Sequence, residues 1–241
     1  MGGNVFKDPA TGESLTKRID RIDVAPTVKL LEVLTGLDLW DNLLGTAGKA
    51  ETSGDIDVAV DETLRSKDDL VTLLTRWSDY RYSDGPATQW VRKSGISVHH
   101  RTAIRGTDAL GFVQVDFMFG DPEWLKWSLR GESTPGFAGR HRHILLSNLA
   151  KNNNIRWSPN KGVMTRNTNI VLSTDTDAVA KYLLDNDATS KDLDNIDSIM
   201  YYVMKFPSWQ QMLVEAEETL SHEGISLLER YDVDRQRIPT P

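Results

Sequence analysis

The feature that most constrains this chain is a short segment in which acidic and apolar residues alternate after a glycine-rich stretch. Residues 54–60, Gly-Asp-Ile-Asp-Val-Ala-Val, have a period of two, which predicts a β-strand with one buried face. On such a strand Asp55 and Asp57 point to the same side, with their backbones about 6–7 Å apart. Two like charges there repel each other, so the pair favours a site for a divalent cation.

A third carboxylate, Asp116, lies within a second apolar segment, residues 111–119, that also reads as a strand. If the two strands are neighbours, Asp116 comes close to Asp55 and Asp57. Three carboxylates in that arrangement can hold two Mg²⁺ ions about 3.5–4 Å apart, the spacing used for in-line phosphoryl transfer. Mn²⁺ is the alternative ion.

The glycine-rich stretch before the first strand has the composition of a phosphate-binding turn. Gly45 and Gly48 permit a tight turn whose backbone N–H groups can face phosphate oxygens, and the hydroxyl of Thr46 can assist. Lys49 adds a positive charge suited to a triphosphate.

The rest of the pattern predicts an α+β chain. We expect a sheet crossed by helices, with a largely helical C-terminal part. The predicted helices cover residues 24–35 (ended by Gly36), a segment starting at Ser66, then 122–130, 140–151, 175–185, 194–205 and 208–230. Two strands within 87–105 are separated at Ser94-Gly95, and a hairpin covers 155–164.

Charge is unevenly distributed along the 241 residues. Residues 1–87 carry a net charge of −6, residues 88–170 carry +7, and residues 171–241 carry −8. The basic middle segment favours a polyanionic partner. The chain has no cysteine and no apolar run of the length that a membrane helix needs, so we expect a soluble, cytoplasmic protein without membrane association.

Taken together, these motifs resemble the polymerase β-type nucleotidyltransferase superfamily, and most closely a minimal family X DNA polymerase. The resemblance is carried by Gly45-Thr46, Lys49, the segment 54–57 and the segment 113–116, with weaker similarity in residues 143–165. It implies a polymerase β-like palm with a mixed sheet flanked by helices. It also implies four parts: a short helical segment 1–43, a palm 44–130, a thumb-like segment 131–170 and an acidic helical extension 171–241.

The same resemblance implies a role for each site residue. Asp55, Asp57 and Asp116 would bind the metal ions, and Asp116 would also accept the proton of the attacking 3′-hydroxyl group. A nucleoside triphosphate would be held by Gly45, Thr46, Lys49, Ser53 and Gly54. From the residues themselves, we expect nucleic acid, with DNA favoured, to contact Arg101, Arg105, Arg140, Arg142 and His143.

Two alternatives remain open from the sequence. The acceptor could instead be RNA, a protein or a small molecule. The chain could also be a nucleic-acid-binding protein that keeps this fold without catalysis. Sugar preference, the use of a template and the oligomeric state have no signal in the sequence.

Overall fold

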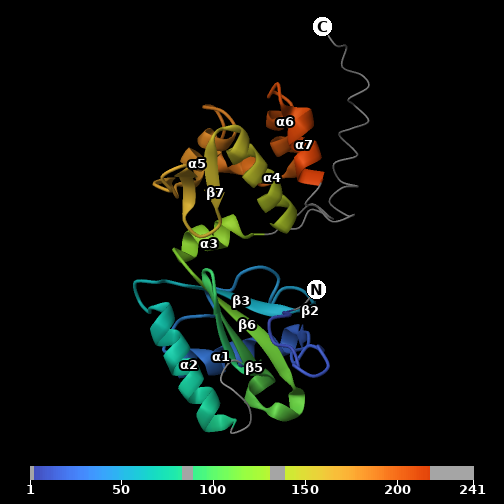
Figure 1. Cartoon of the computed structure of the whole chain (residues 1–241), viewed down its shortest axis with the longest axis vertical. Helices are drawn as coiled ribbons and strands as arrows, with labels where there is room; N and C mark the ends of the chain where they lie inside the picture. The colour runs from blue at the N-terminus through green and yellow to red at the C-terminus, as the bar shows by residue number, and fades with distance from the viewer. Residues whose placement is uncertain (1–2, 83–88, 131–138, 218–241) are drawn as a thin grey trace. The chain divides into compact units, whose positions relative to one another are not determined.

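The computed structural model of the chain (Figure 1) describes residues 3–82, 89–130 and 139–217. The chain divides into two compact units, Met1–Lys126 and Trp127–Pro241. Both combine helices and strands, so the predicted α+β class is confirmed. None of the helices in the described ranges has the length and hydrophobicity needed to cross a bilayer.

The first unit is built on a four-stranded mixed sheet. Its strands are β3 (Asp55–Val60), β4 (Val91–Ser94), β5 (Ser97–Ala103) and β6 (Phe112–Phe119), in the order β3-β6-β5-β4. β3 and β6 are parallel, and the other neighbours are antiparallel. All four strands were predicted, including the break at Ser94-Gly95.

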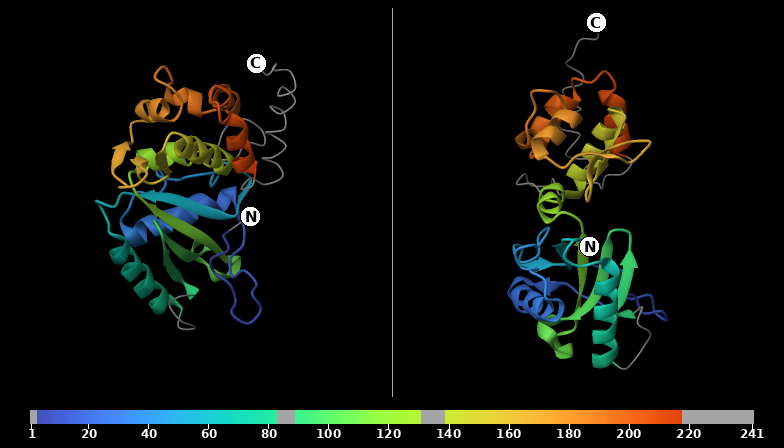
Figure 2. Two further views of the ribbon diagram at one scale, coloured as in Figure 1. Left: turned by 45° about the horizontal axis from the view of Figure 1, so that its top comes forward. Right: turned by 90° about the vertical axis from the view of Figure 1, so that its left-hand side faces the viewer.

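Two helices, α1 (Arg21–Thr35) and α2 (Lys67–Arg81), lie alongside this sheet (Figure 2). α1 ends at Gly36, whose φ of 69° is the left-handed conformation that glycine adopts easily. α2 begins at Ser66, whose side chain accepts a hydrogen bond from the backbone N–H of Asp69. The apolar faces of both helices join one buried cluster with alternate residues of the strands, among them Val24, Val28, Leu31, Leu70, Leu74, Ile56, Val58, Val115 and Phe117.

Residues 1–43, which the resemblance sets apart as a helical segment, lie in the same compact unit as the four-stranded sheet. α1 contributes to the same core as β3 and β6, since its apolar stripe from Val24 to Leu31 is buried in that cluster. β1 (Ile19–Asp20) also pairs with β2 (Thr52–Ser53), immediately before β3. Between β5 and β6 the chain makes two short 3₁₀ turns, η2 (Ile104–Gly106) and η3 (Asp108–Leu110).

The second unit follows α3 (Pro122–Ser128), which contains the boundary between the units. It comprises α4 (Gly139–Asn152), β7 (Ile155–Ser158), β8 (Gly162–Thr165), β9 (Val171–Ser173), α5 (Thr176–Leu183), η4 (Ser190–Leu193), α6 (Ile196–Val203) and α7 (Trp209–Glu217). The predicted hairpin is confirmed as β7 and β8, and β9 extends it to a three-stranded antiparallel sheet that the sequence analysis missed.

Residues 131–170 and 171–241 do not form separate domains. α4 packs against α5 and α7, and α5 packs against β8 and β9, so the thumb-like segment shares its core with the acidic extension. The end of the last predicted helix, 208–230, lies outside the described residues.

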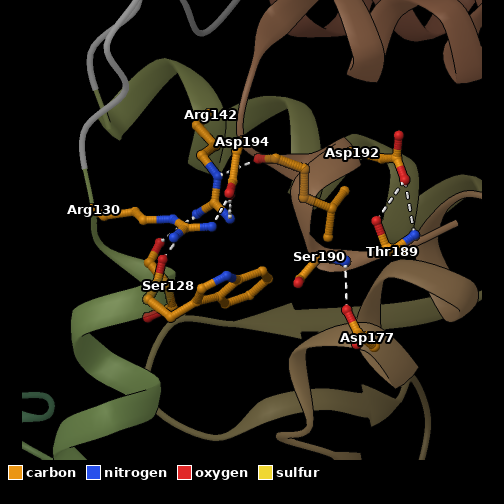
Figure 3. Close-up of polar contacts among 10 residues, drawn as sticks. Ser128, Arg130, Arg142, Asp177, Thr189, Ser190, Asp192 and Asp194 are labelled. Atoms are coloured by element: carbon orange, nitrogen blue, oxygen red, sulfur yellow. Dashed lines mark hydrogen bonds and ion pairs between the residues drawn. The ribbon is translucent and has the colours of Figure 1, made fainter.

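A buried arginine ties the beginning of the second unit to its middle. Arg142 on α4 is 1% exposed, and its Nε donates to the carbonyl oxygen of Leu193 at 2.6 Å. Its Nη1 donates to the carbonyl oxygens of Trp127 and Ser128 at 3.2 and 3.1 Å. Figure 3 shows the guanidinium groups of Arg130 and Arg142 converging on Asp194. Arg142 therefore holds three segments of the chain together.

Candidate active site

Three carboxylates share the polar face of the first unit's sheet. Asp55 and Asp57 alternate on β3 with Ile56 and Val58, which are fully buried in the core. Asp116 lies on β6 directly opposite Asp57 in the parallel register. The two acidic strands are neighbours, which is the condition that the sequence left open, and their register brings all three carboxylates to one face.

These carboxylates influence one another strongly. Burial, and then the charges of Asp55 and Asp116, raise the pKa of Asp57 to about 7 against a smaller lowering effect of His99. Burial, and then the charge of Asp116, also raises the pKa of Asp55. A cluster of this kind is electrostatically unfavourable when ionised, and perturbed groups of this kind concentrate at functional sites.

Asp116 is held by two side chains that the sequence analysis did not assign to the site. Nδ1 of His99 lies 2.7 Å from Oδ1 of Asp116, since β5 places these residues opposite each other. Nε2 of Gln114 donates to both carboxylate oxygens of Asp116 at 2.9 Å. The spacing of two residues between Gln114 and Asp116 was the available signal for Gln114, whereas His99 could be found only from the strand register.

The N-terminal segment also borders the carboxylates. The backbone N–H of Val5 donates to Oε1 of Gln114 at 3.0 Å, and that of Gly3 donates to the carbonyl oxygen of Gly54 at 3.2 Å. Lys7 and Ser14 pair across a short antiparallel turn, and Phe6 between these contacts is fully buried. No pattern in the sequence points to this contribution.

The glycine-rich turn lies beside Asp57. The N–H of Leu44 donates to the carbonyl oxygen of Asp57 at 2.8 Å, which fixes the start of the turn against β3. Gly45 has a φ of +61°, and a Cβ atom there would lie 3.7 Å from Oδ2 of Asp57. Thr46 and Lys49 are exposed on this turn, so both side chains are accessible to a ligand. The structure thus places the predicted turn next to the carboxylates.

Ser53 and Gly54 lead directly into Asp55. Both residues are buried, and the Ser53 hydroxyl forms no hydrogen bond with any described residue. A buried hydroxyl without a partner costs about 1–3 kcal/mol, so such a group is expected to meet a ligand or water. This orphaned hydroxyl is consistent with the phosphate-binding role expected for Ser53.

The residues expected to contact nucleic acid are divided between the two units. Arg101 and Arg105 belong to the first unit, and Arg140, Arg142 and His143 belong to the second. The guanidinium of Arg101 stacks on the rings of Trp90 and Phe112 at 4.3 and 4.2 Å, and Arg105 pairs with Asp23.

In the second unit, the burial of Arg142 makes the prediction that it contacts nucleic acid wrong. Nδ1 of His143 accepts a hydrogen bond from Nε1 of Trp157 at 2.8 Å, and burial lowers the pKa of this histidine. The side chain of Arg140 lies outside the described residues. Internal contacts therefore engage most of the predicted basic surface.

No protein-family model matches the chain, and no curated protein matches it. Within the described ranges, no three His, Cys, Asp or Glu side chains are gathered closely enough to hold a metal ion in their present rotamers.

Proposed function

We propose that the protein is a Mg²⁺-dependent nucleotidyltransferase that transfers a nucleotide from an NTP or dNTP to a 3′-hydroxyl group of nucleic acid, with DNA the favoured acceptor. The observation that supports the proposal is the position of Asp55, Asp57 and Asp116 on one face of the sheet, beside the Gly45 turn. This combination joins a cation site to a phosphate site, which is what phosphoryl transfer requires.

The donor set fits a hard divalent cation. All three side chains offer carboxylate oxygens, the ligands that Mg²⁺ and Mn²⁺ prefer. Burial and the neighbouring carboxylates raise the pKa values of Asp55 and Asp57, and a bound cation would offset both effects. Cation binding requires these side chains to rotate toward a common point, and the register of β3 and β6 already supplies the backbone positions. The bound ions would supply Lewis acidity at the phosphoryl group.

The chain's own residues have distinct roles in this proposal. Asp55 and Asp57 hold the cations, and Asp116 holds a cation and accepts the proton of the attacking hydroxyl group. The acceptor oxygen forms a bond to the α-phosphorus, the bond to the β-phosphate oxygen breaks, and pyrophosphate leaves. The turn bearing Thr46 and Lys49 binds the phosphates, so catalysis comes mainly from positioning and charge neutralisation.

A second candidate function differs in the acceptor. The internal contacts of Arg101, Arg105 and Arg142 leave fewer groups for a nucleic-acid backbone than the sequence suggested. This observation favours testing RNA, protein and small-molecule acceptors of the same nucleotidyl group alongside DNA. A non-catalytic nucleic-acid-binding role would leave three clustered carboxylates without a function.

The test is single-nucleotide extension of labelled gapped duplex DNA, single-stranded DNA and single-stranded RNA with each dNTP and NTP in Mg²⁺. The protein is compared with Asp116→Ala and with the matched control Asp79→Ala, which removes an exposed carboxylate from α2. We expect transfer by the unaltered protein and by the control but not by Asp116→Ala. Full activity of Asp116→Ala would refute the mechanism.

Absence of transfer to the three nucleic acids would move the search to protein and small-molecule acceptors. Calorimetry with Mg²⁺ or Mn²⁺ in the presence of nucleotide separates this case from a binding protein. No detectable cation binding, together with no transfer to any acceptor, would refute nucleotidyl transfer as a whole.

A further inference from the structure

The side-chain amide of Gln114 connects the N-terminal segment with a catalytic carboxylate. Gln114 lies on β6 and is 2% exposed. Its Oε1 accepts the backbone N–H of Val5 at 3.0 Å, while its Nε2 reaches both oxygens of Asp116 at 2.9 Å. The oxygen of this buried amide therefore binds the N-terminal segment, and its nitrogen binds Asp116.

The contact with Val5 determines which way the amide points. A backbone N–H can only donate a hydrogen bond, so it must face the oxygen of the glutamine side chain. The nitrogen then faces Asp116, whose carboxylate can accept two hydrogen bonds. The opposite orientation would set donor against donor at Val5 and oxygen against carboxylate at Asp116. The N-terminal segment thereby selects the orientation in which Gln114 supports Asp116.

Gly3 packs directly against the same side chain. A Cβ atom on Gly3 would lie 2.4 Å from both Cβ and Cδ of Gln114, a distance that no real contact allows. The glycine is needed here for close approach. Its position is fixed from both sides, since its N–H donates to Gly54 and its carbonyl oxygen accepts from Oγ1 of Thr16 at 2.9 Å.

We propose that Gln114 is a positioning residue that orients the Asp116 carboxylate, and that the N-terminal segment acts on the reaction through it. This inference rests on the proposed function, in which Asp116 binds a cation and accepts a proton. Hydrogen bonds of this kind to a metal-binding carboxylate set its orientation, and their removal typically costs 10–100-fold in metal affinity or activity. Gln114 itself touches neither nucleotide nor cation in this scheme.

The test combines Gln114→Met with Gly3→Ala. The first variant keeps an unbranched side chain but removes both hydrogen bonds of the amide. The second variant retains the amide group of Gln114, but the added Cβ atom displaces it from its present position. Gln210→Met, on the exposed surface of α7, is the matched control. Mn²⁺ affinity is measured by calorimetry, and kcat, the KM for nucleotide and the thermal midpoint are measured on the same preparations.

We expect Gln114→Met to weaken Mn²⁺ binding and lower kcat, each by about 10–100-fold, with the KM for nucleotide changed less than threefold. Gly3→Ala should produce the same pattern in weaker form. Because Gly3 acts through Gln114, adding Gly3→Ala to Gln114→Met should lower kcat no further. A purely structural role would lower the thermal midpoint without changing Mn²⁺ affinity below the unfolding transition, and that result would overturn the inference.

The two proposals fail in different ways. If the unaltered protein neither binds Mn²⁺ nor transfers a nucleotide, the proposed function itself is wrong. If the unaltered protein does both and Gln114→Met retains kcat and Mn²⁺ affinity within twofold, only the role of Gln114 is wrong. Independent, multiplicative effects of Gly3→Ala and Gln114→Met would contradict the connection between the N-terminal segment and Asp116.

Discussion

Replacing Asp57 with asparagine should stabilise the metal-free protein at alkaline pH. Asp57 lies between Asp55 on its own strand and Asp116 across the sheet, and burial together with these two charges raises its pKa from 3.8 to about 7. Above pH 7 the folded protein carries a carboxylate that its surroundings disfavour. Asparagine has nearly the same shape and no charge, so it removes this penalty.

The size of the effect follows from linkage between folding and proton binding. Because the pKa of the acid is higher in the folded than in the unfolded chain, the penalty is absent below the unfolded value. It grows as the pH rises through the interval and is complete above the folded value. At about 1.36 kcal/mol per pKa unit, the shift of Asp57 corresponds to about 4 kcal/mol at pH 8 and about 2 kcal/mol at pH 5.

The assay is urea denaturation of the unaltered protein and Asp57→Asn at pH 5 and pH 8, with EDTA present. The free energy of unfolding of Asp57→Asn relative to the unaltered protein should rise by about 1–3 kcal/mol between these pH values. The difference in the free energy of unfolding between the two proteins at one pH removes the contribution of the other titrating groups. The change of that difference between pH 5 and pH 8 removes any constant effect of the new amide. A relative stability that stays the same, or falls, from pH 5 to pH 8 would refute the electrostatic description of the site.

Three further changes test other parts of the structure. Burial lowers the pKa of His100 from 6.5 to about 3. The contribution of neutral His100 to stability is therefore complete above the pKa of the unfolded chain and is lost as the pH falls toward the pKa of the folded protein. Relative to His100→Leu, the free energy of unfolding of the unaltered protein should fall by about 2 kcal/mol between pH 7.5 and pH 5 in urea denaturation. Arg142→Met leaves three buried carbonyl oxygens without their donor and should destabilise the second unit by roughly 3–5 kcal/mol. The measurement is amide hydrogen exchange, which should become faster in α4 than in β6. Equal exchange in α4 and β6 would contradict the role of Arg142 in holding the second unit together. Ser53→Ala removes a buried, unpaired hydroxyl, so the ligand-free protein should be unchanged or up to about 1 kcal/mol more stable, while the KM for nucleotide rises; an unchanged KM would remove Ser53 from the phosphate site.

The sequence predicted the secondary structure of the first unit closely. Alternation identified β3 and β6, and local signals placed Ser66 before α2 and Gly36 after α1. These signals work because a strand with one buried face and a helix end with unpaired backbone groups each impose a local chemical requirement. Domain boundaries were predicted less well. The apolar stripe of a helix such as α1 predicts that one face is buried, but it does not identify the surface against which that face packs.

The arginine residues show that sequence also predicts binding residues incompletely. The sequence identifies Arg142 as a cation but not as a buried donor to three carbonyl oxygens, because the carbonyl of Leu193 reaches it only through the packing of the second unit. Arg101 was assigned to nucleic acid for the same reason, although it stacks on Trp90 and Phe112. Charge is a property of the residue, whereas availability to a partner depends on its neighbours.

The local pattern is enough to place Asp55 and Asp57 on one face of a strand after a glycine-rich turn, because both features follow from the geometry of a few consecutive residues. Three pairings could not be predicted in this way: Asp116 opposite Asp57, His99 beside Asp116, and the hydrogen bond from Val5 to Gln114. These pairings join residues far apart in the chain. Their register is set by packing of the shared core, and no local pattern encodes it.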